Sequence, residues 1–439
     1  MKEQSNRRAF LKRLGMGSLA AAAAPAIIRA RSSHSRLRLA GVGVGGKGWT
    51  DLGECALGHD VVAICDVDER RLERAAERYP GAKKYTDWRK LLEQKDIDAL
   101  TISTPDHMHA PVAYQAMSLG RHVYTQKPLT HSVHEARALT RLAKEKGVVT
   151  QMGIQHHSLA PLRTGVQVVR DGVIGKVREA HVWTNRPGTY WKQEIQRPSG
   201  SDPVPGHVHW DLWLGVAPER PYVDGDVYHP FHWRGWWDFG TGALGDMGCH
   251  LIDPAINALE LGPPSSVWAE GTDPLPESAP RWSIVHYEFP GTRYTTPTLP
   301  LTWYEAGMRP PRQLYGAPDD WPGWANGNLL IGEKGNLLMA GGQTPILFPM
   351  ERFADTVFPT QPDESHYTQW VNAILGKDTA STDFSYSGPL TETVLLGNVA
   401  FRTGKKLKWD SGNLTASGVP EADQYLRRPY RRGWETEGL

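Results

Sequence analysis

The sequence predicts an α/β fold of two domains: a doubly wound parallel sheet, followed by an α+β domain with an open, mostly antiparallel sheet. Three observations predict it. A short apolar strand runs into a glycine-rich turn at residue 43, and strands and helices then alternate to about residue 153. From residue 177 onward, strand-like runs are separated by short turns that contain Gly, Pro or Asn.

Length and composition agree with a multidomain globular protein. The 439 residues suggest two to three domains, and 40% hydrophobic residues suffice for ordinary cores. A net charge of +1 gives no reason to expect a nucleic-acid partner. Three cysteines without paired spacing argue against a disulfide framework. We divide the chain into a signal (1–31), a first domain (32–153), a second domain (154–410) and a C-terminal arm (411–439).

The first 31 residues are typical of a twin-arginine export signal. Arg7 and Arg8 precede Phe10-Leu11-Lys12, and a mild apolar run from Met16 to Ile28 follows. The run is too short and too rich in Ala to span a membrane. We therefore expect the twin-arginine machinery to export the chain, leaving a periplasmic or extracellular protein without a membrane span. The alternative is an ordinary amphipathic N-terminal helix.

The glycine-rich turn predicts a dinucleotide site. Leu37–Val42 is a short buried strand, and Gly43, Gly45 and Gly48 then form a G-x-G-x-x-G pattern. Glycines permit the tight turn and the close approach of backbone N–H groups to a pyrophosphate, at the start of the next helix. A glycine-rich loop without a ligand is the alternative, but its position after a strand indicates a Rossmann domain.

Asp66 indicates NAD rather than NADP. It follows the second strand, Val61–Cys65, where an acidic residue binds the ribose hydroxyls of the adenosine half. A carboxylate there repels the extra phosphate of NADP, so NADP is the less favoured cofactor. Asp66 could alternatively cap the helix Glu69–Arg78.

The alternation of strands and helices continues beyond Asp66. Ligands of such a sheet gather at the carboxyl ends of its strands. Thr104, Pro105, His109, Gln126 and Lys127 lie at two such ends and are candidate cofactor-binding residues. The remaining predicted elements are helices at Trp88–Glu93, Ala110–Ser118 and Ser132–Lys146, and strands at Ala99–Ser103, His122–Thr125 and Val148–Gln151.

At these residues the sequence resembles the Gfo/Idh/MocA oxidoreductases, a family named for glucose–fructose oxidoreductase and inositol dehydrogenase. The motifs that carry the resemblance cover roughly residues 36–410. They are the glycine turn, Thr104-Pro105 with His109, Gly120-Arg121-His122-Val123-Tyr124-Thr125-Gln126-Lys127-Pro128, and Asp246-Met247-Gly248-Cys249-His250. The family pattern usually reads Glu-Lys-Pro, whereas this chain has Gln126 before the lysine.

The second domain is predicted from strand-like runs at Val177–Thr184, Ser266–Glu270, Ser283–Phe289, Leu299–Tyr304 and Asn328–Ile331. The resemblance implies that one face of this sheet carries the substrate. It also implies that the other face commonly makes an oligomer contact, so we expect a homodimer or homotetramer. The polar, Arg-rich arm at 411–439 could lie on a neighbouring subunit or be loose.

The sharpest signal for chemistry is Gly240–Pro254. If this segment is one helix, Asp246, His250 and Asp253 share a face, and a carboxylate one turn from an imidazole can orient it. A polar helix face is the alternative. The resemblance implies that Lys127, Asp246 and His250 are catalytic and surround the reacting carbon, where His250 or Lys127 accepts the hydroxyl proton.

Between residues 183 and 237 the chain is dense in Trp and His. Aromatic faces and polar side chains suit a sugar-binding wall, although an aromatic core with an irregular loop is the alternative. Arg186, Tyr228, His232 and Trp237 are our candidate substrate-binding residues. The His-x-His and His-x-x-His spacings lack an acidic or Cys ligand at useful distance, so we expect no metal.

These observations predict an NAD-dependent oxidoreductase that acts on a hydroxyl or carbonyl of a small carbohydrate or polyol, with the cofactor tightly bound. The alternative is an NAD-dependent glycoside hydrolase. It would oxidise a sugar hydroxyl, eliminate the aglycone, add water and reduce the sugar again.

Overall fold

A computed structural model describes residues 36–318 and 323–439. The predicted signal with Arg7 and Arg8, and the segment 319–322, lie outside the described residues. Residues 38–439 form one compact unit. None of the described helices is both long and apolar enough to cross a membrane.

The first sheet has six parallel strands in the order β3-β2-β1-β4-β5-β6, the arrangement of a Rossmann domain. Its central strands are almost wholly buried on both faces, as parallel sheets covered by helices are. The elements are β1 (Arg38–Val42), α2 (Lys47–Cys55), β2 (Asp60–Cys65), α3 (Glu69–Arg78), β3 (Lys83–Tyr85), α4 (Trp88–Glu93), β4 (Ala99–Ile102), η1 (Asp106–Met108), α5 (His109–Ser118), β5 (His122–Gln126), α6 (Val133–Lys146) and β6 (Thr150–Gly153).

Local sequence explains where α6 begins and ends. Ser132 accepts a hydrogen bond from the backbone N–H of Glu135, and the Glu135 carboxylate accepts one from the N–H of Ser132. This reciprocal cap satisfies amide groups that a helix N-terminus otherwise leaves unpaired. Gly147 ends the helix in the left-handed conformation that glycine adopts without steric cost.

The second sheet has nine strands in the order β13-β12-β11-β7-β10-β9-β8-β14-β15. All its pairings are antiparallel except that of β7 with β10, so the prediction of a mostly antiparallel sheet is confirmed. Its strands are β7 (Val177–Trp183), β8 (Ser266–Gly271), β9 (Ser283–Pro290), β10 (Thr298–Tyr304), β11 (Gly327–Gly332), β12 (Asn336–Ala340), β13 (Gln343–Phe348), β14 (Leu407–Asp410) and β15 (Thr415–Ser417).

The second half also contains helices, some of which contact this sheet and some of which contact elements of the first domain. They are α7 (Ala160–Arg170), α8 (Trp210–Leu214), α9 (Gly242–Leu251), α10 (Asp253–Leu259), α11 (His366–Ile374), α12 (Phe384–Thr403) and α13 (Asp423–Leu426), with short turns η2 (Gln155–Ser158), η3 (His232–Gly235), η4 (Arg312–Leu314), η5 (Met350–Phe353) and η6 (Pro420–Ala422).

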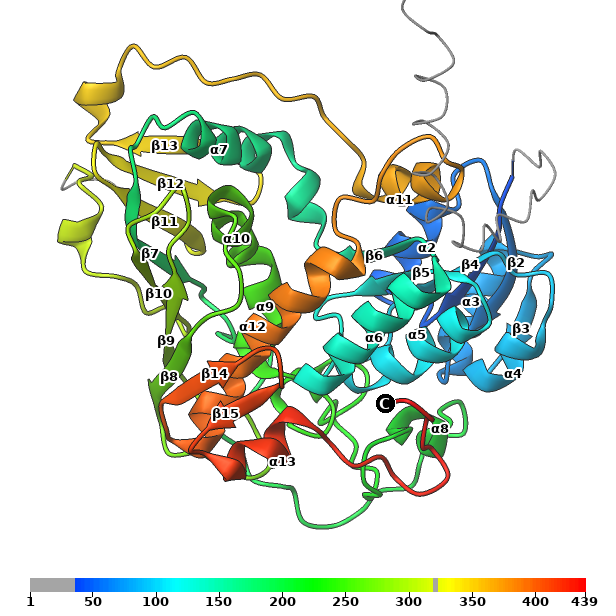
Figure 1. Ribbon diagram of the computed structural model, residues 1–439. Helices are drawn as coiled ribbons and strands as arrows, with labels where there is room; N and C mark the ends of the chain where they lie inside the picture. Colours follow the sequence, from blue (N-terminus) through cyan, green and yellow to red (C-terminus); the bar gives the residue numbers. More distant parts are fainter. Residues whose placement is uncertain (1–35, 319–322) are drawn as a thin grey trace, which may run out of the picture. The chain divides into compact units, whose positions relative to one another are not determined.

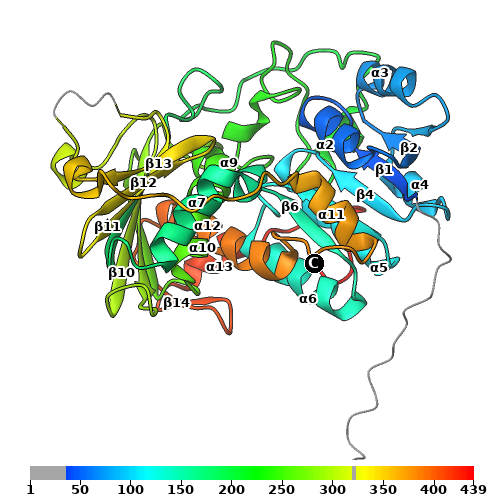
Figure 2. The ribbon, with the colours of Figure 1, turned by 90° about the horizontal axis from the view of Figure 1, so that it is seen from above.

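The long helix α12 joins the two domains. It packs against α6 of the first domain and against α9 and β8 of the second (Figure 1). Arg137 of α6 makes a two-pronged ion pair with Glu392 of α12, at 2.7 Å for each hydrogen bond. Figure 2 shows α11 and α12, far along the chain, beside the elements of the first domain. Helix α9, which carries Asp246 and His250, therefore packs against a helix that is itself joined to the first domain.

The C-terminal arm packs on its own chain. The Tyr430 hydroxyl donates to Glu135 at 2.7 Å, and Arg431 donates to Asp211 of α8. The guanidinium of Arg89 lies 4.1 Å from the ring centre of Trp434. The arm thus contacts helices of its own first domain and α8, and a contact with a neighbouring subunit stays a prediction.

Candidate active site at the carboxyl edge of the first sheet

The glycine turn connects β1 to α2. Gly43 has a φ of 76°, and a Cβ there would lie 2.7 Å from the carbonyl oxygen of Ser103. A Cβ on Gly48 would lie 1.8 Å from the carbonyl oxygen of Gly43, so α2 starts directly against the turn. A side chain at either position would break this packing. Gly43, Gly45 and Gly48 therefore occupy the three crowded positions expected of the glycines in a G-x-G-x-x-G turn.

Asp66 lies at the end of β2 against the same turn. One carboxylate oxygen accepts hydrogen bonds from the backbone N–H groups of Val44 (3.0 Å) and Gly45 (3.2 Å). The other accepts one from the N–H of Asp68 at 3.0 Å. Burial raises the pKa of Asp66, and these donors partly oppose the rise. The helix that follows is capped by Asp68, not by Asp66.

His109 ties two loops of the site together. Its ring nitrogens lie 2.8 Å from the carbonyl oxygen of Pro128 and 2.9 Å from that of Thr104. Burial lowers the pKa of His109 to about 4, so a neutral ring donates to one of these two carbonyls. The candidate cofactor loops at Thr104-Pro105 and Gln126-Lys127 are thus joined through one buried imidazole.

The residues present fit a dinucleotide. The glycine turn leaves no room for side chains, and the first turn of α2 offers backbone N–H groups to phosphates. The buried hydroxyl of Thr104 has no hydrogen-bond partner. Among the described residues, Gly43, Gly45, Gly48, Asp66 and Thr104 would hold the NAD that such a domain binds.

Lys127 and Asp246 form the central ion pair. The Lys127 ammonium lies 2.7 Å from an oxygen of Asp246, and the guanidinium Nε of Arg234 lies 3.2 Å from the same oxygen. Burial favours the neutral acid, but the two cations outweigh it and lower the pKa of Asp246. Asp246 is therefore a carboxylate held by two cations. Arg234 lies in the segment 183–237 that is dense in Trp and His, and it is not among the candidate residues named from the sequence.

His250 lies one helical turn after Asp246 and contacts His156. The two imidazole rings have centres 4.8 Å apart and are tilted by 40°. Both Nδ1 atoms are buried without a hydrogen-bond partner. Burial, His156 and Lys127 hold the pKa of His250 well below its usual range, and burial also lowers the pKa of His156. The site thus contains two neutral imidazoles.

The expectation that Asp253 shares a helical face with Asp246 and His250 is wrong. Helix α9 ends at Leu251, and Asp253 begins the separate helix α10. Asp253 instead accepts hydrogen bonds from His157 at 2.9 Å and from the hydroxyl of Tyr386. The local reason is Pro254, which has no N–H to continue the helix and fits the first turn of a new one.

Asp106 is a buried carboxyl near the ion pair that sequence reasoning did not single out. It accepts a hydrogen bond from the hydroxyl of Thr241 at 2.7 Å, at the start of α9. Burial raises the pKa of Asp106 to about 7, against the opposing charges of Lys127 and Arg234. Its place in the loop after Pro105 was the one available signal.

None of the contacts described for the four candidate substrate residues is with Lys127 or Asp246. Tyr228 and Trp237 are buried in separate hydrophobic clusters, and the Trp237 indole donates to the carbonyl of Leu275 at 3.2 Å. Arg186 stacks 3.4 Å from the ring centre of Tyr190, and His232 lies 3.7 Å from Asp226. Their role in substrate binding stays a prediction.

The histidines with metal-like spacing have carboxylate neighbours. His209 pairs with Glu69 at 2.8 Å and His229 with Asp68 at 3.2 Å. Within the described ranges, no group of three or more His, Cys, Asp and Glu side chains is arranged to hold a metal ion. The three cysteines are free and buried.

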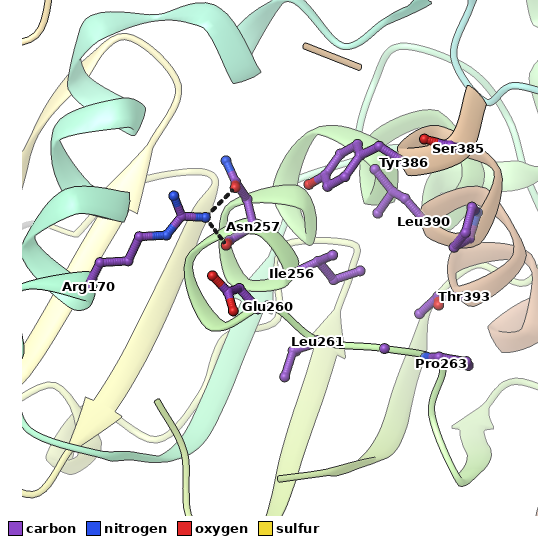
Figure 3. A pocket seen from close by; sticks show the side chains of 12 residues that line it. Arg170, Ile256, Asn257, Glu260, Leu261, Pro263, Ser385, Tyr386, Leu390 and Thr393 are labelled. Carbon is purple, nitrogen blue, oxygen red and sulfur yellow. Dashed lines mark hydrogen bonds between the residues drawn. The ribbon is translucent and has the colours of Figure 1, made fainter. Parts of the chain in front are cut away.

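A surface pocket of about 480 Å³ lies between α7, α10 and α12 (Figure 3). Arg170 crosses it and donates to the carbonyl and side-chain oxygens of Asn257. Tyr386 lines the pocket from α12. None of the residues predicted for the site lines this pocket.

Two segments of the chain match models of one protein family. Residues 15–154 match the model described as "Oxidoreductase family, NAD-binding Rossmann fold" of Gfo/Idh/MocA, and residues 160–291 match the "C-terminal alpha/beta domain" of the same family. Together the two matches cover more than half of the chain. The first contains the whole six-stranded sheet, and the second contains β7, β8 and β9 of the nine-stranded sheet.

Three similar proteins illustrate the likeness. A levoglucosan dehydrogenase of Pseudarthrobacter phenanthrenivorans is 25% identical over 192 residues, 44% of this chain and 40% of that protein. A glycosyl hydrolase family 109 protein of Shewanella sp. (strain ANA-3) is 30% identical over 175 residues, 36% of this chain and 37% of that protein. The chain thus matches less than half the length of either relative.

The third is the solved structure of the WlbA dehydrogenase from Bordetella pertussis in complex with NADH and UDP-GlcNAcA. It aligns with a TM-score of 0.60 and 18% identity, over 85% of this chain and 98% of that one. At this identity the likeness establishes the fold alone.

Proposed function

Because this chain belongs to the Gfo/Idh/MocA oxidoreductase family, we propose that it oxidises or reduces a carbon–oxygen group of a sugar or polyol with NAD that stays bound between turnovers. The observation that carries the proposal is the meeting of Lys127, Asp246 and His250 at the edge of the sheet that bears the glycine turn. The sugar dehydrogenase among the relatives supports the substrate class.

In the oxidising direction a C–H and an O–H bond of the substrate break and a C=O bond forms. Bound NAD supplies the acceptor for the hydride. The hydroxyl proton needs a base, and His250 is a neutral imidazole with an unpartnered Nδ1. Lys127 donates a hydrogen bond to the same substrate oxygen, which stabilises the negative charge that develops there.

Asp246 and Arg234 position Lys127. The carboxylate of Asp246 accepts hydrogen bonds from both cations, so the ammonium of Lys127 is held on one side and keeps its other N–H groups for the substrate. Reduction of a carbonyl runs through the same contacts in reverse, with His250 returning the proton.

The direct test is a screen of aldoses, ketoses, polyols and glycosides, followed by nicotinamide absorbance and by identification of the product. A ketosugar or lactone formed from one of them supports the oxidoreductase. If no carbohydrate changes the redox state of the bound nicotinamide, the proposal fails.

A second candidate is a glycoside hydrolase that uses NAD transiently, favoured by the similarity to the family 109 protein. Such an enzyme oxidises a sugar hydroxyl, so that the carbonyl acidifies a neighbouring C–H, and the aglycone then leaves by elimination. Water adds to the double bond, and the carbonyl would be reduced again by return of the hydride that the dinucleotide would hold. Release of a reducing sugar from a glycoside without net NADH would select this candidate.

The proposal includes export by the twin-arginine machinery, for a periplasmic or extracellular enzyme, and assembly into a homodimer or homotetramer. Arg7 and Arg8 before a mild apolar run support export. The family resemblance supports assembly, which sedimentation of the mature protein would test.

A further inference from the structure

Gln126, which stands where the family usually has Glu, lies against a carboxylate from another element. Its side-chain N–H donates to Asp51 of α2 at 2.8 Å. Asp51 is fully buried, and the same oxygen also accepts from the hydroxyl of Ser103 at 2.8 Å. A Glu at 126 would place two carboxylates at hydrogen-bond distance in a buried site, at a cost that only protonation of one could relieve. The amide of Gln126 therefore suits this position, because it donates a hydrogen bond to Asp51 without adding a second negative charge.

The second oxygen of Asp51 faces α11. The hydroxyl of Tyr367 donates to it at 3.1 Å, and the ammonium of Lys47 lies 2.8 Å from it. Lys47 also donates to the Tyr367 oxygen at 2.7 Å. Burial and the charge of Asp51 raise the pKa of Tyr367, so the phenol stays a donor. Lys47, Asp51, Gln126 and Tyr367, with Ser103, form one closed hydrogen-bond network, which we call the Asp51 network.

The network joins the dinucleotide turn to the second domain. Lys47 is the first residue of α2 and follows Gly46 of the glycine turn, whereas Tyr367 comes from α11, about 300 residues later. Helix α11 itself is anchored, because the ring of His366 lies between the carbonyl of Met152 (3.0 Å) and the hydroxyl of Ser158 (2.9 Å). Tyr367 therefore reaches α2 from a fixed base.

We propose that the Asp51 network is a latch that holds α11 against the first turn of α2 and thereby sets how slowly the bound dinucleotide leaves. This inference rests on the proposed tight cofactor binding. It assigns retention to α11, in place of the C-terminal arm, whose contacts lie at α6, α4 and α8. The negative charge of Asp51 is balanced by Lys47, so the network adds no net charge beside the phosphates.

The test measures the dissociation rate of NADH. Protein loaded with NADH is mixed with excess NAD⁺, and the loss of energy transfer from tryptophan to NADH is followed. Tyr367→Phe removes one hydroxyl that bonds a buried carboxylate, and we expect dissociation to become about 10-fold faster. Tyr430→Phe is the matched control, because it removes the same kind of phenol–carboxylate bond from the C-terminal arm. Its rate should equal that of the unchanged protein.

A charge exchange tests the same network independently. Gln126→Glu alone should accelerate dissociation of NADH, because two carboxylates then lie at hydrogen-bond distance. Asp51→Asn combined with Gln126→Glu should restore a slow rate, because one amide again faces one carboxylate. Thermal melting verifies that each variant is folded. Unchanged rates in Tyr367→Phe and Gln126→Glu, or acceleration in Tyr430→Phe, would overturn the latch. A protein that binds no NADH at all would instead refute the proposed function.

Discussion

Asp246 is held as a carboxylate by two cations. It makes no hydrogen bond to the imidazole of His250, one helical turn away. Its oxygen accepts from Lys127 and Arg234, whereas the Nδ1 of His250 is buried and unpartnered. Under the proposed function the two residues have separate roles: Asp246 positions the ammonium of Lys127, and His250, whose lowered pKa keeps it neutral, is the proposed base.

This separation predicts that two variants lose turnover for different reasons. His250→Ala removes the base, and Asp246→Asn removes the charge that fixes Lys127, so each should lower turnover by ~10²-fold or more. NAD content should be unchanged, because neither side chain contacts the glycine turn. Turnover and bound nucleotide measured on the same samples check this. A variant with near-normal turnover would remove its residue from the catalytic set.

Asp106 predicts a pH dependence of stability. Burial raises its pKa from 3.8 to about 7 in the folded protein. The group therefore favours folding while it is protonated, fully below pH ~4, and this contribution is lost as the pH rises to about 7, at most about 4 kcal/mol by linkage. Asp106→Asn should flatten that part of the profile. Urea unfolding at pH 5 and pH 8 measures it, and an unchanged difference between the two pH values would contradict it.

Residue spacing could predict some of the site but not all of it. Asp246 and His250 are found because they are one turn apart on one helix, and the glycine turn because it is local. Arg234, His156 and Asp106 reach the site only through packing between loops that are distant in sequence. No spacing along the chain contains that information.

At the scale of elements, strands were predicted better than helices of the second domain. The strand β9 alternates buried and half-exposed residues, which is the period that a half-covered sheet imposes. Helix α12 escaped prediction because it is buried on nearly all sides and contains Pro389, so it lacks an amphipathic period. The break between α9 and α10 was missed because Asp246, His250 and Asp253 were read as one face of a continuous helix.

The turn η2 carries His156, and the next residue, His157, fixes this turn by a hydrogen bond. His157 bonds Asp253, which also accepts the hydroxyl of Tyr386 from α12. Burial lowers the pKa of His157, but the charge of Asp253 and its hydrogen bond outweigh this, so the pKa is raised overall. Adjacent histidines are thus held in opposite states, one paired with a carboxylate and one neutral beside His250.

This arrangement predicts a positioning effect for Tyr386→Phe. Losing one hydrogen bond to a buried carboxylate loosens η2, and turnover should fall roughly 3- to 10-fold while NAD content stays the same. The imidazole NMR signal of His156 should shift in the same variant. Tyr304→Phe, which removes a tyrosine–histidine contact in the second sheet, is the control. An unmoved His156 signal would leave Tyr386 with a purely structural role.

At the scale of the whole molecule, the proposed export signal would determine the compartment in which the enzyme works. Replacing Arg7 and Arg8 by Lys should keep the precursor in the cytoplasm, because the twin-arginine machinery reads that pair. Cell fractionation with an antibody to the mature chain measures this. Unchanged export would mean that the segment is not a twin-arginine signal.

Export and dinucleotide binding together predict a retained cofactor. Free NAD is scarce outside the cytoplasm, so an enzyme that released NADH at each turnover would stall there. Loading before export, in the folded chain, resolves this, provided that the dinucleotide stays bound and is reset on the enzyme. Resetting requires either a second sugar that is reduced, or re-reduction of the same sugar during hydrolysis. We therefore expect freshly purified mature protein to release NAD on denaturation and to turn over without added cofactor. Protein that is empty, needs millimolar NAD and releases one NADH per product would contradict this expectation and leave the fold and the family assignment untouched.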